Sequence, residues 1–122
     1  MTQQPTVVWT EIPVTDLEKS IGFYSALFGW TMQRDDTGPN PMANFSDDMQ
    51  AVSGHLYPGK PASGEGPTIH LALPGSLEEG IERCAAEGGK VLSPAISIPP
   101  GRFAYALDPD GNSIGLFEPA QR

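Results

Sequence analysis

The chain has 122 residues, 18% of them charged and 39% hydrophobic, which predicts a single globular domain over residues 1–122 and excludes a disordered polyelectrolyte or a membrane span. With 15 acidic against 7 basic residues, its formal net charge is −8, and no basic stripe exists that could neutralise phosphates. We therefore expect neither nucleic acid nor an anionic membrane surface as a partner. The 14 glycines and 13 prolines are spread along the chain, which indicates many turns between short strands.

The N-terminal segment and the single cysteine predict a cytoplasmic protein. The segment MTQQPTVVWTEI lacks the charged start and the apolar stretch of a secretory signal peptide. Cys84 has no second cysteine with which to form an internal disulfide. It lies on the apolar face of an expected helix, so we expect it to pack as a small apolar residue rather than to act as a nucleophile.

The first half of the chain predicts one strand, one helix and three further short strands. Residues 7–12 (VVWTEI) are β-branched and aromatic and alternate between two faces, which is typical of a strand. Residues 15–18 have the pattern of a helix capping box, and Gly29 is expected to end the helix that follows. The apolar face of this helix is expected at Leu17, Ile21, Tyr24 and Phe28. Three further strands are expected at 30–34, 42–46 and 51–57.

The second half repeats this plan. A capping box at residues 76–79 begins a second helix, and Gly88-Gly89 ends it. Strands are expected at 68–73, 90–92, 102–107 and 113–117, with a hairpin turn at 108–112. Residues 60 or 61 positions apart match, for example Leu17 with Leu77 and Gly54 with Gly115. One unit is therefore present twice, as module one (about residues 6–57) and module two (about 68–118), joined by a linker (about 58–67).

Three segments carry a resemblance to one known superfamily. They are EIPVTDLEKSIGFYSALFGW, AAEGGKVLSP and GRFAYALDPDGNSIGLFEP, and they occur in the order that the family has. On these residues the chain resembles the glyoxalase/bleomycin-resistance/extradiol-dioxygenase superfamily, also called vicinal oxygen chelate (VOC) proteins. The resemblance implies an α+β fold in which two βαβββ modules face each other around a cavity. It also implies a homodimer.

The resemblance further implies where a divalent metal would bind, with one ligand from the first and one from the last strand of each module. Carried over residue by residue, the positions in the first and last strands fall on Trp9 and Gly115, and the internal repeat maps these onto Ile69 and Gly54. None of these side chains can ligate a metal. We therefore expect the usual metal site to be absent and no cofactor to be bound. His55 and His70 each lie one residue from such a position, and both are expected to face away from the cavity. Only a local slip or bulge would turn either into a metal ligand.

Further residues are candidates for the cavity wall. Glu11 shares a strand face with Trp9 and is a candidate general base; alternatively it is paired or solvated at the strand end. The aromatic residues Phe103, Tyr105 and Phe117 provide a stacking wall for a planar ligand, or else they fill the core. The ligand-binding cavity is thus expected to be lined by Trp9, Glu11, Gly54, Ile69, Phe103, Tyr105, Gly115 and Phe117.

Three functions stay open on the sequence alone. The favoured one is a VOC-type protein that binds a partly apolar small molecule in the cavity between the modules, without a metal. The alternative is a lyase, isomerase or dioxygenase-like enzyme, which is either metal-dependent through a rearranged site of His55, His70 and Glu11, or metal-free with Glu11 as base. The third is a structural module whose cavity is filled by its own side chains, namely Trp9, Ile69 and Phe117.

Overall fold

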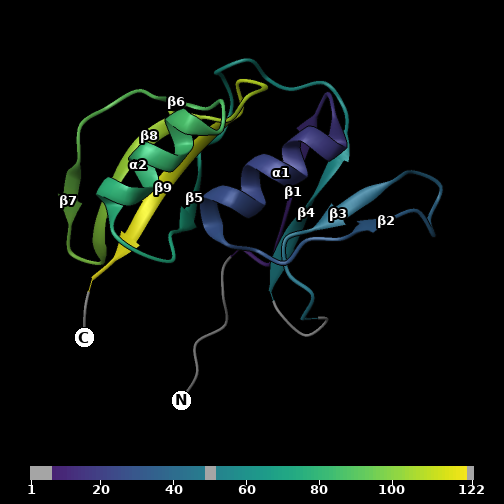
Figure 1. The fold of residues 1–122 in the computed structure, drawn as a ribbon, viewed down its shortest axis with the longest axis horizontal. Coiled ribbons are helices and arrows are strands. Elements are labelled where there is room, and N and C mark those ends of the chain that lie inside the picture. Colours follow the sequence, from purple (N-terminus) through teal and green to yellow (C-terminus); the bar gives the residue numbers. More distant parts are fainter. Residues whose placement is uncertain (1–6, 49–51, 121–122) are drawn as a thin grey trace.

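The computed structural model describes residues 7–48 and 52–120, and these form two similar units of strands and one helix each (Figure 1). Module one contains β1 (Trp9–Val14), α1 (Leu17–Phe28), β2 (Arg34–Asp35), β3 (Met42–Asn44) and β4 (Ser53–Pro58). Module two contains β5 (Ile69–Ala72), α2 (Leu77–Ala86), β6 (Lys90–Val91), β7 (Ile96–Ile98), β8 (Gly101–Leu107) and β9 (Ser113–Pro119). The expected α+β fold class and its internal repeat are confirmed.

The two sheets have the same topology. The strand order is β1-β4-β3-β2 in module one and β5-β9-β8-β6 in module two, with β7 also paired to β8. In each module the strand before the helix runs parallel to the last strand, and all other pairs are antiparallel. The first strand of each module is consequently an edge strand. In Figure 1 the edge strands β1 and β5 lie toward the middle of the molecule, where the two modules meet.

The strands differ from the sequence expectation mainly at their ends. The first strand is β1, which begins two residues later than expected and extends to Val14. Residues 30–33 are not in a strand, and the expected strand at 51–57 is described only from residue 52. The extra strand β7 was not expected. Prolines flank Ile96–Ile98, yet this segment pairs antiparallel with β8, so tertiary pairing outweighs local strand propensity here.

Both helices begin at a side-chain cap, but not in the same way. In α2 the expected capping box is present: the Ser76 hydroxyl accepts a hydrogen bond from the Glu79 backbone N–H, and the Glu79 carboxylate accepts one from the backbone N–H of Ser76. The capping box expected at residues 15–18 is wrong. The cap of α1 is Asp16, whose carboxylate accepts a hydrogen bond from Lys19 N at 3.2 Å, and Thr15 is bonded to Asp110 of module two instead.

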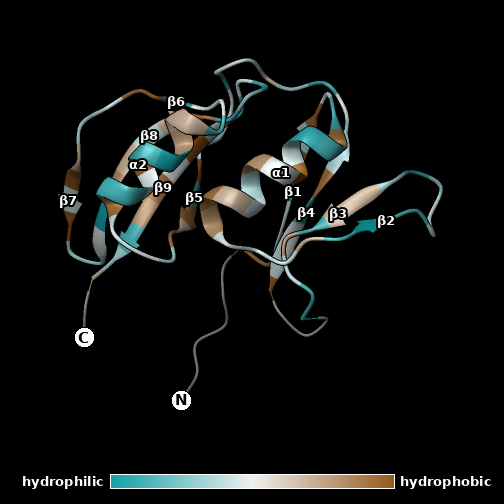
Figure 2. Cartoon of the chain, in the orientation of Figure 1, coloured by the Kyte–Doolittle hydropathy of each residue, from teal (hydrophilic) through white to brown (hydrophobic). Residues whose placement is uncertain are grey.

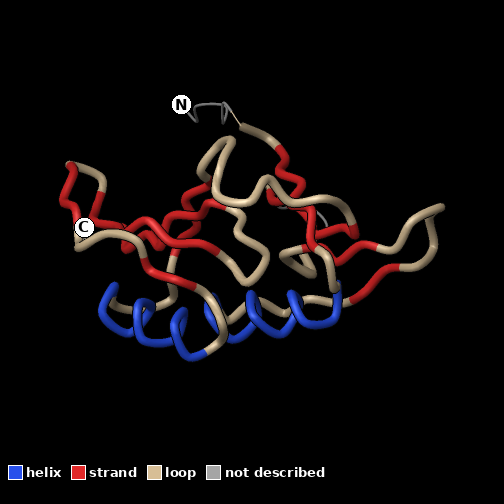
Figure 3. Tube along the Cα trace, turned by 90° about the horizontal axis from the view of Figure 1, so that it is seen from above, coloured by secondary structure: helices blue, strands red, loops and turns tan. Residues whose placement is uncertain are grey.

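Each helix covers one face of its sheet, and Figure 3 shows both helices on the same side of the strands. Figure 2 shows hydrophilic and hydrophobic residues alternating along both helices, as amphipathic packing requires. The core behind the sheet of module one combines aromatic with aliphatic side chains, whereas behind that of module two it consists mainly of aliphatic side chains and alanines. Its fully or nearly fully buried members include Phe23, Tyr24, Phe28 and Phe45 in module one, and Leu77, Ala104, Ala106, Ile114 and Leu116 in module two.

The turn at residues 108–112 joins the two modules. It closes the β8–β9 hairpin, as expected, with Gly111 at φ +87. From this turn, Asp108 accepts a hydrogen bond from the Tyr24 hydroxyl at 2.8 Å, and Asn112 Nδ2 donates one to the carbonyl of Pro13 at 2.8 Å. Asp110 also accepts a hydrogen bond from the Thr15 backbone N–H at 3.2 Å. The orientation of module two on module one therefore depends on directional polar contacts as well as on apolar packing.

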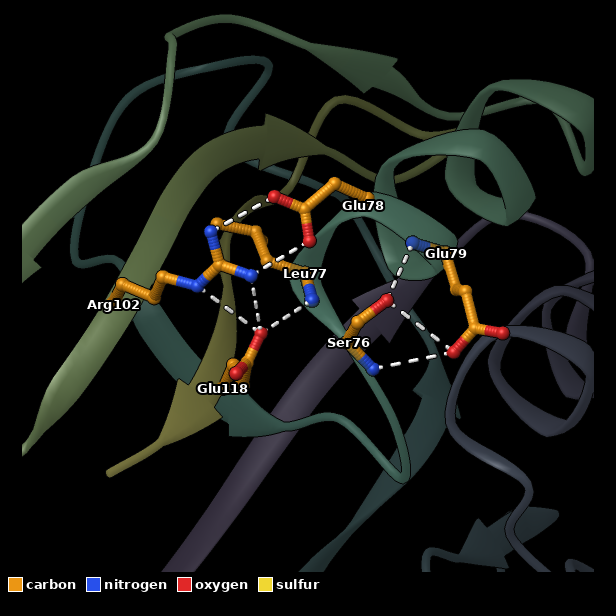
Figure 4. A network of polar contacts seen from close by, with 6 residues as sticks. All are labelled: Ser76, Leu77, Glu78, Glu79, Arg102 and Glu118. Carbon is orange, nitrogen blue, oxygen red and sulfur yellow. Dashed lines mark hydrogen bonds and ion pairs between the residues drawn. The ribbon is translucent and has the colours of Figure 1, made fainter. Parts of the chain in front are cut away.

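A second polar network, shown in Figure 4, fixes the start of α2 to the last two strands. The Arg102 guanidinium contacts the Glu78 carboxylate at 2.6 Å and the Glu118 carboxylate at 2.8 Å. Glu118 also accepts a hydrogen bond from the backbone N–H of Leu77 at 2.7 Å, the first residue of α2. The hydrogen bonds from Arg102 lower the pKa of the Glu78 carboxyl, and the hydrogen bonds from Leu77 N–H and Arg102 lower that of Glu118. No helix in the described residues is both long and apolar enough to cross a membrane.

Candidate functional site

Each sheet has one face covered by a helix and one turned away from it, which we call the open face. In β1 the alternation is plain: Ile12 and Val14 are buried toward α1, whereas Trp9 is 45% exposed and Glu11 is exposed. Residues paired across neighbouring strands point to the same face. The β1–β4 register, in which Glu11 lies beside His55 and Thr10 beside Gly54, therefore places His55 on the open face and Gly54 on the helix side.

On the open face of module one, Trp9, His55 and Glu11 form a connected group. Trp9 Nε1 donates a hydrogen bond to His55 Nδ1 at 3.0 Å, and His55 Nε2 lies 3.3 Å from Glu11 Oε1. Because an indole N–H can only donate, His55 Nδ1 must carry no proton in this arrangement. The proton of the neutral ring then lies on Nε2, where it can be donated to Glu11. This geometry fixes the tautomer of His55 and holds one oxygen of the Glu11 carboxylate in place.

On the open face of module two, His70 lies among aromatic rings. Its ring centroid is 4.7 Å from that of Phe103, 5.9 Å from that of Tyr105 and 6.1 Å from that of Phe117. The ring lies directly over Gly115, its partner in the β5–β9 register, and a Cβ at Gly115 would collide with it. Glycine at this position thus allows the His70 ring to pack against the backbone of β9.

These registers correct the expected ligand positions. Trp9 and Gly115 are on the open faces, but Gly54 and Ile69 are on the helix side, where Gly54 lies against Phe45 and Ile69 pairs with the buried Ile114. The four positions therefore do not share one face. The expected direction is wrong for His70, which lines the large cavity described below, whereas His55 lines neither that cavity nor the smaller pocket beside it. An error of one residue in aligning the repeat exchanges the two faces of a strand, and this error misplaced Gly54 and Ile69.

Only two potential metal ligands come together on the open faces. Glu11 and His55 are adjacent in module one, while His70 in module two is surrounded by aromatic rings. In residues 7–48 and 52–120, no three His, Cys, Asp or Glu side chains gather in a way that could hold a metal ion. Both ring nitrogens of His55 are also engaged, by Trp9 and by Glu11. The residues described within one chain thus do not fit the divalent metal that the resemblance implies.

The single cysteine packs as an apolar residue. Cys84 is fully buried in α2, as expected for a small apolar residue. Its burial, with a smaller effect of the nearby Asp108 carboxylate, raises its pKa to about 11. A raised pKa favours the thiol over the nucleophilic thiolate at neutral pH.

A cavity of about 770 Å³ lies between the modules. Its apolar wall includes Trp30 and Phe45, whose rings stack at 4.6 Å and 22°, together with Ile69 and Leu71 from β5. Its polar groups are His70 and four hydroxyl side chains: Thr10, Ser46, Ser53 and Thr68. None of the described residues that line it is Asp, Glu, Lys or Arg. The cavity is thus largely apolar, electrically neutral and bordered by hydrogen-bonding hydroxyls.

The expected cavity residues lie in three different places. Ile69 lines this cavity, and Glu11 lines a neighbouring pocket. The other six lie outside the walls of both: Gly54 on the helix side, and Trp9, Phe103, Tyr105, Gly115 and Phe117 on the open faces. The stacked pair Trp30 and Phe45 was not expected. No local pattern in the sequence brings these two rings together, because Phe45 follows β3 and Trp30 follows α1.

Comparison with known proteins gives consistent matches along the chain. The sequence profile of the Glyoxalase/Bleomycin resistance protein/Dioxygenase superfamily matches residues 6–116. A glyoxylase-like domain-containing protein of Didymella fabae is 33% identical over 117 residues, which cover 87% of this chain and 88% of the relative. The CFP32 protein of Mycobacterium bovis is 29% identical over 126 residues, which cover 95% of this chain and 46% of the relative. The chain thus spans about half the length of that relative.

Among solved structures, the fold is similar to that of TnmS3, an antibiotic binding protein from Streptomyces sp. CB03234. The TM-score is 0.65 at 26% sequence identity, and the match covers 98% of this chain and 100% of the other.

Proposed function

The chain belongs to the Glyoxalase/Bleomycin resistance protein/Dioxygenase superfamily, and from that membership we propose that it binds a flat, partly apolar small molecule between its modules. The observation that carries the proposal is the cavity of about 770 Å³ with its Trp30–Phe45 stack. Ligand pockets in proteins are commonly about 300–1,000 Å³, mostly apolar, with a few polar groups that fix orientation. The similarity in fold to TnmS3, an antibiotic binding protein, supports small-molecule binding on this fold.

The lining favours a neutral ring system. The described lining residues include no charged side chain, so a charged ring would find no partner in the cavity. Burying an unpaired charge costs free energy. Hydroxyl or carbonyl groups on the ring could instead bond to Thr10, Ser46, Ser53 or Thr68. Stacking on the face of Trp30 supplies area for a planar molecule.

Binding can be measured with N-ethyl-1-naphthylamine, a neutral planar probe. The chain has 2 tryptophans, so Trp9→Phe leaves Trp30 as the only indole reporter, and its emission should change as the probe enters the cavity. For a probe of this size we expect a Kd on the order of 0.1 mM. Calorimetric titration of the unmodified chain gives the same constant without relying on fluorescence.

A matched pair of variants locates the site. Ala72→Phe places a ring at the cavity wall from an exposed position of β5 and should weaken binding about tenfold. Ala26→Phe adds the same ring on the exposed side of α1 and should leave the Kd unchanged. Equal affinities in the two variants, or no binding by the unmodified chain at millimolar probe, would contradict the proposal.

An enzymatic function is the second candidate, and the contact of Glu11 with His55 favours it. A carboxylate held by a neighbouring hydrogen bond can act as a general base, which typically contributes about 10²–10⁴-fold to a rate. This candidate predicts deuterium exchange from D₂O into the α-carbon of 2-hydroxyacetophenone, a planar α-hydroxyketone. Glu11→Gln should abolish the exchange, whereas Glu82→Gln on the exposed face of α2 should not. Equal exchange rates in both variants would remove Glu11 as the base.

A homodimer is part of the proposal, and the exposed open faces support it. Trp9 is 45% exposed and Tyr105 38% exposed, each at the centre of an aromatic group that a second copy could cover. Sedimentation of the unmodified chain should give about twice the chain mass of 13.0 kDa. Tyr105→Glu should dissociate the dimer and Tyr105→Phe should not; a monomer at all concentrations would contradict the dimer.

A cytoplasmic location also belongs to the proposal, supported by the single unpaired cysteine.

A further inference from the structure

A smaller pocket of about 260 Å³ adjoins the large cavity along the groove between the modules. It is formed by β1, by the segment that links the modules and by the start of β9, with Glu11, Ile12, Pro13, Lys60, Ala62, Glu65, Pro67, Ile69, Asn112, Ser113 and Ile114 in its wall. Pro67 and Ile69 line both spaces. These two side chains therefore stand at the boundary between the large cavity and the smaller pocket.

The two spaces differ in charge. The described lining of the large cavity contains no ionisable side chain other than His70. The smaller pocket is lined by two carboxylates, Glu11 and Glu65, against one ammonium, Lys60. Glu11 is partnered by His55, whereas no ion pair joins Glu65 to another residue in the described part of the chain. Glu65 is exposed at the pocket wall, so its carboxylate can take up a cation from a ligand.

We propose that the ligand has two parts: a flat neutral head in the large cavity and a short arm that passes Ile69 and ends in an ammonium group beside Glu65. This inference rests on the proposed function, because the head occupies the same cavity. It adds the chemical class of the ligand, an aromatic alkylamine, and it assigns Ile69 as the residue that controls access to the smaller pocket. The chain charge of −8 favours a cation over an anion in the same position.

Two probes that differ only at the end of the arm test the proposal. N-(1-naphthyl)ethylenediamine carries a terminal ammonium at neutral pH, and N-ethyl-1-naphthylamine has the same ring and a shorter, neutral arm. An exposed ion pair with Glu65 should make the ammonium probe bind about threefold more tightly at low salt. The preference should disappear at about 1 M salt, where the Debye length is roughly 3 Å.

Variants identify the residues that produce the preference. Glu65→Gln should bring the two Kd values together by weakening the ammonium probe only, and Lys60→Gln should widen the difference. Ile69→Phe should close the passage and remove the preference while the neutral probe still binds. Leu71→Phe, which changes the wall of the large cavity alone, should affect both probes equally. Circular dichroism of each variant shows that the fold is retained.

The outcomes separate this inference from the proposed function. Equal binding of both probes to the unmodified chain, or an unchanged preference in Glu65→Gln, overturns the two-part ligand and leaves the cavity proposal standing. No binding of either probe overturns the cavity proposal and this inference with it. A preference for the ammonium probe that is lost in Glu65→Gln and in Ile69→Phe, but kept in Leu71→Phe, supports both.

Discussion

The two modules have the same sheet topology, and both have aromatic residues on the open face, but only module one also has large rings packed behind its sheet. In module one the rings of Tyr24, Phe28 and Trp30 stack behind the sheet, on the helix side. In module two the rings of Phe103 and Phe117 stack on the open face, and the helix side is packed with aliphatic residues and alanines. The topology therefore does not determine where the large apolar side chains go.

This difference distinguishes the aromatic residues that stabilise the fold from those that can contact a ligand or a second copy of the chain. Aromatic burial behind a sheet contributes chiefly to folding, because those rings are removed from water within one chain. Rings on an open face are available to a ligand or to a second copy of the chain. Module one accordingly provides the aromatic core, with Trp30 and Phe45 reaching the large cavity at its edge. The exposed aromatic groups lie on both modules, around Trp9 in module one and around Tyr105 in module two.

The largest predicted effect comes from removing one phenylalanine in each module. Phe28 is 3% exposed and stacks on Trp30 at 4.9 Å, so Phe28→Ala should lower the free energy of unfolding by about 3 to 5 kcal/mol. Phe117 is only partly buried on the open face, and Phe117→Ala should cost about 1 to 2 kcal/mol. Urea denaturation of both variants measures the difference. Equal losses would show that the open face of module two is as closely packed as the core of module one.

Local features of this chain were predictable from sequence, and the faces of the strands were not. The end of α1 at Gly29 and the Ser76 capping box depend on residues a few positions apart, so the sequence carries them directly. The helix α2 ends at Ala86 with Glu87 as its cap, just before the expected Gly88-Gly89. The direction of His55 and His70 depends on the registers of β1 with β4 and of β5 with β9, which one misplaced residue reverses. The stacking of Trp30 on Phe45 depends on how the segments after α1 and β3 pack within module one, and the boundary at Ile69 depends on how the modules meet. No short sequence pattern exists for either.

The junction between the modules makes the second prediction, a loss of stability in alkali. Tyr24 of module one and Cys84 of module two both lie near Asp108. Burial is the larger cause, and the Asp108 carboxylate the smaller one, of the raised pKa of both side chains. The pKa of Cys84 rises to about 11. The unfolded thiol ionises near pH 9, so between about pH 9 and 11 the folded chain keeps a proton that the unfolded chain loses. The stability is therefore complete below pH 9 and falls by about 2 to 3 kcal/mol as pH rises through this window.

Cys84→Ala is the matched variant for the alkaline transition. It removes the thiol, so its free energy of unfolding should fall less steeply than that of the unmodified chain from pH 9 to 11. The remaining slope at higher pH comes from Tyr24, whose pKa is raised well above its usual value. Identical slopes in both proteins, measured by urea denaturation at each pH, would show that the thiol is not desolvated at the junction.

The smallest predicted effect distinguishes how the modules cap their helices. The α2 cap relies on Ser76 and Glu79 within module two, so Ser76→Ala should lower the free energy of unfolding by about 1 kcal/mol. At α1, Asp110 of module two accepts a hydrogen bond from the Thr15 backbone N–H, next to the Asp16 cap. Because Asp110 also holds the start of this helix, Asp16→Ala should lower the free energy of unfolding by a few tenths of a kcal/mol less than Ser76→Ala does. Adding Asp110→Ala to each variant tests the reason. Loss of Asp110 should increase the cost of Asp16→Ala and leave that of Ser76→Ala unchanged, because only the first helix begins against the other module.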